Sequence, residues 1–355
     1  MQQIIEERKA RITIPKSEKI SKQMPVFYNP VMKHNRDISI LLLNSINKKE
    51  MQIADPLAAS GIRSLRFLLE LDTQTIKNIS INDYNRDFLK LMKNNLKLNN
   101  IKNNKKIIIS NNDANLFLLN STGFDYIDID PFGTPNPFLD SAVKRIARDG
   151  ILALTATDLS SLAGTYPLVC KRRYWAVPLR NELMHEIGLR ILIRKIQLIG
   201  VQYEKALIPI FSYFKDHYFR VFFRCEKGKN KADKIISEHS LFEDAGPMWI
   251  GRLWDTNLAN KIYANFLKNE LLSHDSELNN FLKTIKEESA INTIGFYDIH
   301  KIVKRNKLKQ IPKQEELMIR IKKSGYKAAA THFNVQGIRS NISLEELIKI
   351  INKFK

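Results

Sequence analysis

Short apolar runs rich in isoleucine and valine alternate along the chain with longer segments in which leucine or isoleucine recurs every three to four residues. The runs are typical of buried strands, and the longer spacing is typical of amphipathic helices. The predicted strands are Met51–Asp55, Ile79–Asp83, Lys106–Ser110, Phe124–Asp130 and Ile151–Thr157. Helices are predicted between them around Ser64–Leu71, Arg86–Leu98 and Leu139–Ala147. This alternation indicates an α/β fold with a parallel sheet that carries helices on its faces.

The second half of the chain changes pattern twice. After a long amphipathic segment, Leu183–Ile199, the strands Lys205–Phe211 and His217–Cys225 lie only a few residues apart, which predicts an antiparallel hairpin. The polar stretch Glu226–Lys234 has no apolar anchor and is interpreted as a linker, beyond which helices and short basic segments follow. We therefore predict a first domain over residues 1–226 and a smaller mixed α/β carboxyl-terminal domain over residues 235–355.

The chain is strongly basic. Lysine and arginine together number 57, against 37 aspartates and glutamates, which leaves a formal net charge of +20 over 355 residues. Such an excess repels itself unless an acidic partner screens it, so nucleic acid is the leading candidate partner. Lysine, isoleucine and asparagine are all abundant, however, and a biased genome composition explains the charge equally well. The charge alone leaves the partner open.

Cysteine usage and the absence of long apolar stretches narrow the class of protein. Cys170 and Cys225 are too few for a disulfide framework or a four-cysteine zinc site, so a reducing cytoplasm is expected and no metal is predicted. Residues 1–15 mix charges with isoleucines and lack the apolar core of a signal peptide. Because no stretch reaches the ~20 apolar residues of a membrane span, we expect a soluble, cytoplasmic protein with no membrane partner. No obligate protein partner is evident.

Acidic residues lie at or just after the ends of the first three predicted strands, at the sheet edge where parallel α/β folds bind ligands. Asp55 opens a loop of small residues that runs to Gly61, where a cofactor can approach the backbone. Asp83 lies 22 residues beyond Gly61, near the ~20-residue offset at which a carboxylate binds ribose hydroxyls. Asp113 and Ala114 follow the third strand, where a carboxylate suits an adenine amine and a small side chain leaves room for the ring. A strand-to-helix turn explains the loop after Asp55 equally well, and a helix cap explains Asp83, so each signal is weak singly and only the series indicates a cofactor.

The segment Asp128-Ile129-Asp130-Pro131-Phe132-Gly133 is placed where the fourth strand should end. Methylation of an exocyclic amine needs an acceptor for an amine hydrogen, because the nitrogen lone pair is delocalised into the ring. Asp130 would supply that acceptor, and Phe132 would give an extruded base a stacking surface. Strand alternation turns Asp128 away from its immediate neighbours, which favours Asp130 as the catalytic residue, although both carboxylates could face the polar end. A β-turn with Phe132 capping the core explains the same residues.

Six segments occur in a characteristic order: Val26-Phe27-Tyr28-Asn29-Pro30, Asn35-Arg36-Asp37, Ala59-Ser60-Gly61-Ile62-Arg63, Asp128–Gly133, Thr155-Ala156-Thr157-Asp158 and Lys215-Asp216-His217-Tyr218-Phe219-Arg220. Together they resemble the tRNA (guanine-26) dimethyltransferase family in its archaeal form. Further matches at Gly246–Gly251 and Thr331-His332-Phe333 extend the resemblance into the second domain. The five predicted parallel strands and their closing hairpin are likewise similar to the class I, Rossmann-like sheet of methyltransferases that use S-adenosylmethionine.

The resemblance implies transfer of one and then a second methyl group from S-adenosylmethionine to the 2-amino group of guanine 26 in tRNA. Asp130 matches the catalytic acidic residue, and Phe27 and Phe132 match aromatics expected to sandwich the target guanine. The cofactor-binding positions of the family are matched by Arg36, Arg63, Asp83, Asp113 and Ala114. Arg66, one helical turn beyond Arg63, is a weaker candidate for the same anion as Arg36. Some relatives carry a four-cysteine metal site in the second domain, and the present sequence departs from them.

Basic and aromatic segments supply candidate contacts to tRNA. Lys171-Arg172-Arg173-Tyr174-Trp175 suits phosphate binding, and a solvated basic turn explains it as well. The helix-like run His300–Arg320 and the loop Thr331–Arg339 are plausible contacts to the tRNA backbone. His185 and Glu186 are adjacent on a predicted helix and face different directions, so they are interpreted as structural rather than as a metal pair.

Two other functions remain open at this point. An acidic residue followed by proline and an aromatic also serves amino-methyltransferases that act on adenine in DNA or RNA. An RNA-binding protein that keeps the fold without catalysis is the alternative from another class, although Asp130 together with Asp83 and Asp113 argues against it.

Overall fold

The centre of the computed structural model, which describes residues 2–15, 27–102 and 105–354, is a seven-stranded sheet in the order β5-β4-β3-β6-β7-β9-β8. The first five of these strands along the chain are parallel, and the hairpin of β8 and β9 pairs antiparallel to β7. The strands are β3 (Met51–Asp55), β4 (Ile76–Asn82), β5 (Ile107–Ser110), β6 (Phe124–Ile129), β7 (Ile146–Ala156), β8 (Lys205–Lys215) and β9 (Tyr218–Lys227). This topology confirms the predicted class I methyltransferase sheet.

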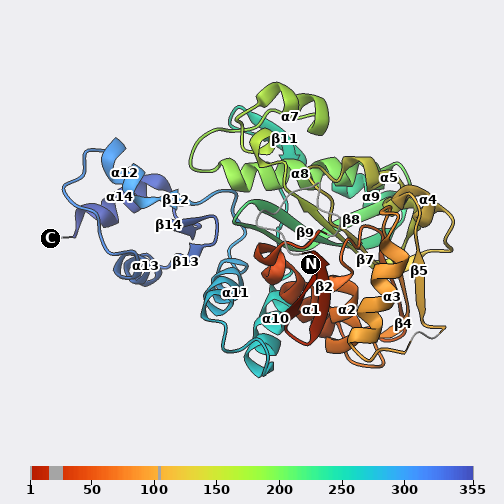
Figure 1. Cartoon of the computed structure of the whole chain (residues 1–355). Helices are drawn as coiled ribbons and strands as arrows, with labels where there is room; N and C mark the ends of the chain where they lie inside the picture. Colours follow the sequence, from red (N-terminus) through yellow and green to blue (C-terminus); the bar gives the residue numbers. More distant parts are fainter. Residues whose placement is uncertain (1, 16–26, 103–104, 355) are drawn as a thin grey trace.

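Helices cover both faces of the sheet (Figure 1). In that view α5 and α8 lie above β7, β8 and β9, and α1 and α2 lie on the other side of the sheet. The helices of this part are α1 (Lys33–Ile46), α2 (Ile62–Glu70), α3 (Phe88–Leu98), α4 (Ala114–Leu119), α5 (Leu139–Arg145), α6 (Leu159–Leu162), α7 (Pro167–Tyr174) and α8 (Met184–Val201). Ile53, Ile79 and Ile127 from neighbouring strands are fully buried between the two helical layers, which explains the isoleucine-rich runs in the sequence.

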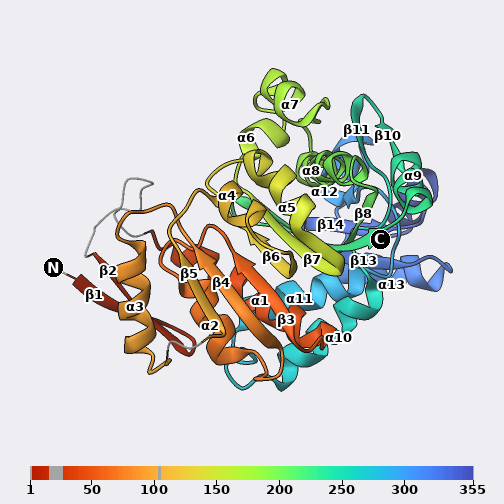
Figure 2. The same cartoon turned by 90° about the vertical axis from the view of Figure 1, so that its right-hand side faces the viewer.

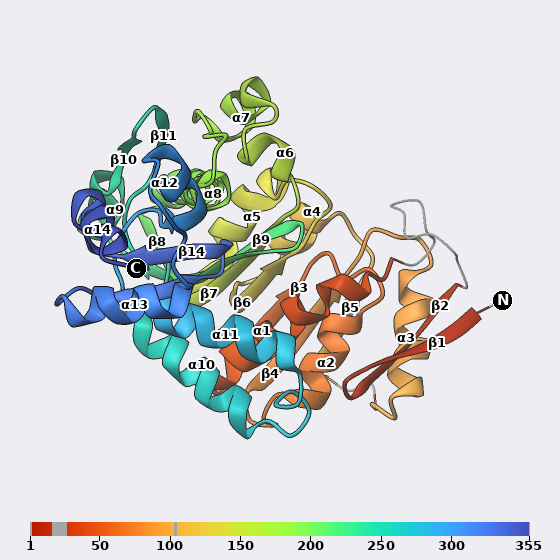
Figure 3. The same ribbon diagram turned by 90° about the vertical axis from the view of Figure 1, so that its left-hand side faces the viewer.

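An amino-terminal hairpin, which the apolar pattern did not predict, lies against α3 (Figure 3). Its strands are β1 (Gln2–Glu7) and β2 (Ala10–Pro15). Asparagine side chains of α3 hold it, because Asn95 Oδ1 accepts from the Thr13 amide at 3.0 Å and Asn99 Oδ1 accepts from the Arg11 amide at 2.8 Å. The alternation of charged residues and isoleucines in this segment therefore reflects a two-stranded hairpin that packs one of its faces against the rest of the molecule.

The segment predicted to be a linker, Glu226–Lys234, is instead regular structure. β9 continues to Lys227, and α9 (Lys229–Ser237) follows immediately, with Ala232 and Ile235 buried. The sparse apolar residues of this segment fall three apart, which is enough for one helical contact face. After it come β10 (His239–Phe242), β11 (Ala245–Trp249), α10 (Thr256–Lys268) and α11 (Ser276–Glu288).

The main apolar core continues well past residue 234. Leu258, Ile262 and Leu282 of α10 and α11 belong to it, and Asn265 of α10 donates to Ser45 Oγ of α1 at 3.0 Å. A separate apolar cluster contains only residues between Ile299 and Ile351. The separation of the two cores does not coincide with the predicted boundary, and the division of labour between residues 1–226 and 235–355 stays a prediction.

The carboxyl-terminal unit is a three-stranded sheet, β12-β14-β13, with three helices, and it projects to one side of the molecule (Figure 1). Its elements are β12 (Tyr297–Asp298), α12 (Ile299–Arg305), α13 (Gln314–Lys323), β13 (Ala328–Thr331), β14 (Asn334–Ser340) and α14 (Leu344–Asn352). Two sequence predictions need correction here. His300–Arg320 is two helices rather than one run, and Thr331–Arg339 is the hairpin of β13 and β14 rather than a loop.

Buried ion pairs join this unit to the main core. Arg339 of β14 contacts Glu186 of α8 at 2.7 Å and Glu288 of α11 at 3.1 Å, and all three side chains are fully buried. His185 stacks on Phe214 with ring centroids 3.9 Å apart. These contacts confirm the structural interpretation of His185 and Glu186. No helix within residues 2–15, 27–102 and 105–354 is both long and apolar enough to cross a membrane.

Candidate functional site

The parallel strands β3 to β6 lie side by side (Figure 2), and acidic candidate residues lie at or beyond their carboxyl-terminal ends. Asp55 ends β3, Asp83 follows the last residue of β4, and Asp130 follows the last residue of β6. Asp113 comes after β5, as the cap of α4. Because all of these strands run in the same direction, their ends meet at one edge of the sheet, which is where the sequence placed them.

The loop between β3 and α2 is held in place by packing and hydrogen bonds. Gly61 has φ +76°, and a Cβ atom there would collide with Met92 Sδ, so a larger residue would strain the backbone and displace Met92. Asp83 Oδ2 accepts from the Ala59 amide at 2.7 Å, while its Oδ1 accepts from the Asn85 amide at 2.9 Å. The carboxylate of Asp83 thus fixes the loop and stands beside it, in a position that suits a ribose.

Asp113 and Ala114 lie at the next strand end. Asp113 Oδ1 caps α4 by accepting from the Asn115 and Leu116 amides at 2.9 and 3.1 Å, and its side chain is exposed. Ala114 is buried. Asp113 is therefore a helix cap, a role that the sequence left open for Asp83 instead, and both cap bonds use Oδ1, which leaves Oδ2 to a ligand. The residues at these strand ends fit a nucleoside cofactor.

The Asp130 carboxylate is paired with the guanidinium of Arg63 and is 21% exposed. The same guanidinium donates to Ser39 Oγ at 3.1 Å and to Asn35 Oδ1 at 2.9 Å. Asn35 belongs to the Asn-Arg-Asp segment of α1, so three distant segments converge on one side chain. The structure thus places Arg63, which the resemblance assigns to the cofactor, in direct contact with the predicted catalytic residue.

Asp128 lies behind this pair and is fully buried. Arg220 of β9 contacts it at 2.6 Å, and Arg63 contacts it at 3.2 Å. Burial alone would raise the pKa of Asp128, but the two guanidinium groups outweigh burial and lower it. Both Asp128 and Asp130 face Arg63, as expected for positions two apart on a strand. We call Arg63, Asp128, Asp130 and Arg220 the strand-edge cluster.

Phe27 and Phe132 come together although 104 positions separate them in the chain. Their rings contact edge to face, with centroids 4.4 Å apart and planes at 80°. Phe132 is 45% exposed. A base stacked between parallel rings needs their planes about 7 Å apart, twice an ordinary carbon contact, so the rings must separate before a base can enter. Val26, which begins the same motif, lies outside the described residues.

Sequence reasoning missed Glu7, which organises the arginines on the other side of the cluster. Its carboxylate accepts from Arg36 at 2.7 and 2.5 Å, from Arg66 at 2.9 Å and from the Tyr28 hydroxyl at 3.0 Å. Burial alone would raise the pKa of Glu7, but Arg36 and Arg66 lower it to about 2. A lone glutamate in a charged hairpin carries no signal that would have identified it.

These pairs bear on two predicted cofactor contacts. Arg36 is almost fully buried and held by Glu7, and its contact with the cofactor carboxylate stays a prediction. Arg66 is fully buried and pairs with Glu7, Asp37 and Glu70 at 2.9, 2.6 and 2.8 Å. With three carboxylates around it and no exposed surface, Arg66 has a structural role, and the structure does not favour it as an anion site.

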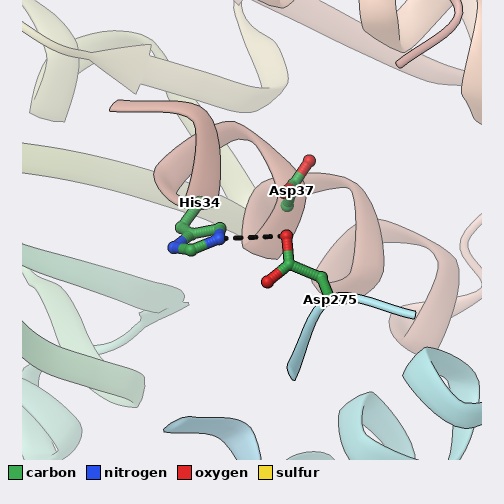
Figure 4. A group of neighbouring side chains, drawn as sticks. All are labelled: His34, Asp37 and Asp275. Carbon is green, nitrogen blue, oxygen red and sulfur yellow. Dashed lines mark hydrogen bonds and ion pairs between the residues drawn. The ribbon is translucent and has the colours of Figure 1, made fainter. Parts of the chain in front are cut away.

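His34, Asp37 and Asp275 bring potential metal ligands within 4.8 Å of one another (Figure 4). The Arg8 guanidinium already contacts Asp37 at 2.8 Å and Asp275 at 2.9 Å, and Arg66 contacts Asp37. Two guanidinium groups therefore occupy the carboxylates and would repel a cation. This group is an ion-pair cluster that ties the amino-terminal hairpin to α11.

A cavity of about 810 Å³ lies beside β8, away from these residues. Two of its lining residues, Ala206 and Glu226, lie at the start of β8 and the end of β9, which is the edge of the sheet opposite the carboxyl-terminal ends of the parallel strands. Its charges are matched, because Lys231 contacts Glu226 at 2.6 Å and Arg224 contacts Asp255 at 3.7 Å. The cavity therefore differs from the strand-edge site in both position and electrostatics.

Comparison with known proteins decides the family. A family model described as N2,N2-dimethylguanosine tRNA methyltransferase matches residues 8–244 and 238–352. The chain belongs to this family. It is 42% identical to a tRNA (guanine(26)-N(2)/guanine(27)-N(2))-dimethyltransferase of Aquifex aeolicus, over 98% of this chain and 95% of the relative. It is 36% identical to a tRNA (guanine(26)-N(2))-dimethyltransferase of Methanocaldococcus jannaschii, over 98% of each chain.

A solved structure of the family superposes over nearly the whole length. Trm1 from Pyrococcus horikoshii, in complex with S-adenosyl-L-methionine, has a TM-score of 0.88 and 36% identity, covering 98% of this chain and 99% of that chain. Both the methyltransferase sheet and the carboxyl-terminal unit therefore belong to the shared architecture. The sequence resemblance to the family is confirmed, while the roles of individual residues stay predictions.

Proposed function

We propose that this chain transfers methyl groups from S-adenosylmethionine to the exocyclic 2-amino group of guanine 26 in tRNA, giving N2-methyl- and N2,N2-dimethylguanosine. One observation supports this function above the others. A carboxylate, Asp130, and two aromatic rings, Phe27 and Phe132, meet at the strand edge beside the loop fixed by Asp83. Acceptor, base-stacking surface and cofactor loop are the three parts that amine methylation needs.

In the proposed site Asp83, Asp113 and Ala114 hold the nucleoside part of the cofactor, and Arg36 and Arg63 stand on the side of its amino-acid part. The cofactor supplies a methyl group on a positively charged sulfur. Phe27 and Phe132 stack on the extruded guanine and hold its amine in line with that methyl group.

Asp130 accepts a hydrogen bond from the guanine 2-amino group, which directs the nitrogen lone pair toward the methyl carbon. As the nitrogen–carbon bond forms, the sulfur–carbon bond breaks with its electron pair left on sulfur. The Asp130 carboxylate then takes the proton from nitrogen. Arg63, held by Asp128, Asn35 and Ser39, fixes the carboxylate in place throughout.

The test uses the full chain, an unmodified tRNA transcript and S-adenosylmethionine, with nucleosides analysed by mass spectrometry. Wild type should produce methylated guanosine at the 2-amino group. Asp130→Asn should lower the transfer rate by at least about 10²-fold, because it removes the proton acceptor while Asp128 still pairs Arg63. The matched control is Asp233→Asn on the exposed surface of α9, which should transfer at the wild-type rate.

Each alternative function has its own outcome. Methyladenosine as the product would replace the proposal with an adenine amino-methyltransferase. Failure of wild type to bind S-adenosylmethionine in calorimetry, with tRNA affinity retained, would favour an RNA-binding protein without catalysis. If Asp130→Asn lost tRNA and cofactor affinity as severely as transfer, Asp130 would be a structural residue.

A further inference from the structure

The last turn of α7 presents a basic face around an exposed tryptophan. Leu168, Lys171, Arg172 and Trp175 follow one another at spacings of three, one and three residues, which places them on one side of the helix. All four are exposed, whereas Cys170 and Tyr174 on the other side are buried. The helix therefore packs through one face and leaves a basic face in solvent.

Two further cations reach the same place from the middle of α8. The Lys195 ammonium lies 2.9 Å from the centroid of the Trp175 ring, and Arg194 donates to the Trp175 carbonyl at 3.3 Å. We call Lys171, Arg172, Trp175, Arg194 and Lys195 the Trp175 patch. The patch thus concentrates four positive groups contributed by two helices.

No carboxylate within residues 2–15, 27–102 and 105–354 lies within 4.0 Å of any cation of the Trp175 patch. Arg194 Nε is buried and has no hydrogen-bond partner among those residues. Burial, and then the charge of Arg194, lower the pKa of Lys195 to about 8. Uncompensated charge of this kind costs stability, and a bound anion would relieve it.

Attraction to the carbonyl end of a helix explains only part of this arrangement. Cations in the last turn of α7 do interact favourably with its carbonyls. Arg173, in that turn, has in addition a carboxylate partner, Asp158, at 2.8 Å. Arg194 and Lys195 come from the interior of α8, where Arg194 donates to the carbonyl of Trp175, the C-cap of α7, and Lys195 lies over the Trp175 ring. Because these contacts bring no negative charge to the two cations, an anion from outside the chain is still favoured there.

Hydrogen bonds connect the helix that carries the Trp175 patch to the loop that carries Phe132, one of the two rings proposed to stack on the target guanine. Asn136, in the loop after β6, donates to the Arg173 carbonyl at 2.9 Å, and the Tyr174 hydroxyl donates to Asp158 at 3.2 Å. Thr157, adjacent to Asp158, exchanges hydrogen bonds with Gly133, the neighbour of Phe132. α7 therefore rests on the loop that carries Phe132, at the rim of the proposed active site.

We propose that the Trp175 patch binds the sugar-phosphate backbone of the tRNA strand that flanks the target guanosine. Lys171 and Arg172 contact successive phosphates, and Arg194 and Lys195 add positive potential behind them. This inference rests on the proposed function, because it takes tRNA as the substrate. It assigns the patch to backbone positioning, which fixes the register of the strand and reads no base.

The decisive variant is the full chain with Lys171→Ser and Arg172→Ser together. We expect the affinity for tRNA at physiological salt to fall on the order of tenfold, and the slope of log Kd against log salt concentration to decrease by about 1.5 to 2, for two lost phosphate contacts. Because the affinity for tRNA falls, the KM for tRNA should rise as well. Affinity for S-adenosylmethionine, measured by calorimetry, should equal that of wild type.

Two matched variants make the result interpretable. Lys90→Ser with Lys93→Ser removes the same charge from the exposed surface of α3, on the other face of the sheet, and should keep the wild-type salt slope. Lys171→Arg with Arg172→Lys keeps the charge and should keep the affinity. An unchanged salt slope in the Lys171 and Arg172 double serine variant, or a loss equal to that of the α3 control, would overturn the proposal.

The outcomes separate this inference from the proposed function. If wild type methylates guanine and the double serine variant binds tRNA normally, only the patch assignment fails. If wild type binds tRNA through the patch but produces no methylated guanosine, the proposed function fails and the patch remains an RNA-binding surface.

Discussion

Two groups of cations in this molecule have opposite environments. In the strand-edge cluster, Arg63 and Arg220 are almost completely buried, and each contacts Asp128. In the Trp175 patch, Lys171 and Arg172 are exposed, and no carboxylate of the described ranges pairs with them. The first group has carboxylate partners, and the second has none among the described residues, although Arg220 Nε, like Arg194 Nε, has no hydrogen-bond partner there.

This difference shows what each group of charges contributes. A buried guanidinium must be paired, because desolvation of an isolated charge costs several kcal/mol, so the strand-edge arginines hold carboxylates in fixed positions. Surface cations have no such requirement, and they remain available to an external polyanion. The net charge of +20 alone therefore does not distinguish the buried basic residues that hold carboxylates from the exposed ones that remain available to a polyanion.

The largest expected effect comes from breaking the strand-edge cluster. Asp128→Asn leaves Arg220 without a carboxylate partner in a fully buried position, and the free energy of unfolding should fall by about 3–5 kcal/mol. Urea unfolding at pH 7 measures it. Asp125→Asn on the same strand breaks the partly exposed pair with Lys48 and should cost about 1 kcal/mol or less. If the two variants lost equal free energy of unfolding, burial would not determine how much each ion pair contributes to stability.

A smaller effect is expected at Glu7. Glu7→Gln weakens the hydrogen bonds to Arg36 and Arg66, and the free energy of unfolding at pH 7 should fall by about 1.5–3 kcal/mol. The folded-state pKa of Glu7 is lowered from 4.5 to about 2, so its contribution is present above pH 4.5 and is lost as the pH falls toward 2.

The pH dependence provides the control for that prediction. Urea unfolding of wild type and Glu7→Gln at pH 7, 4.5 and 3 should show a stability difference that shrinks as the pH falls. A difference that stays constant over this range would mean that Glu7 acts through packing rather than through its charge.

The smallest effect is expected at the Trp175 patch. Lys171→Ser with Arg172→Ser should change the free energy of unfolding by no more than about 0.5 kcal/mol, because both side chains are exposed and no carboxylate of the described residues pairs with them. Thermal unfolding in the absence of RNA measures this. A loss comparable to that of Glu7→Gln would show that the patch has an intramolecular partner and would remove the contrast with the strand-edge cluster.

Local pattern was sufficient for the central sheet. The strand Met51–Asp55 was predicted with its observed limits, and its almost continuous burial is typical of a strand between two helical layers. The second and fourth strands were predicted to end at Asp83 and Asp130, each one residue beyond the observed end of β4 and β6. The amino-terminal hairpin and α9 were not predicted, because their apolar residues are few and gain their burial from α3 and β8, which are distant in sequence.

The amino-acid sequence by itself determined the sheet, the order of acidic strand ends and the family, since each depends on local spacing or on motifs that stay together in the chain. Tertiary structure alone decided how the charges are matched. Glu7 meets Arg36, Asp128 meets Arg220, and Lys195 meets Trp175 only after the chain has folded. Charge compensation acts over a few ångströms in space, and separation along the chain carries no information about it.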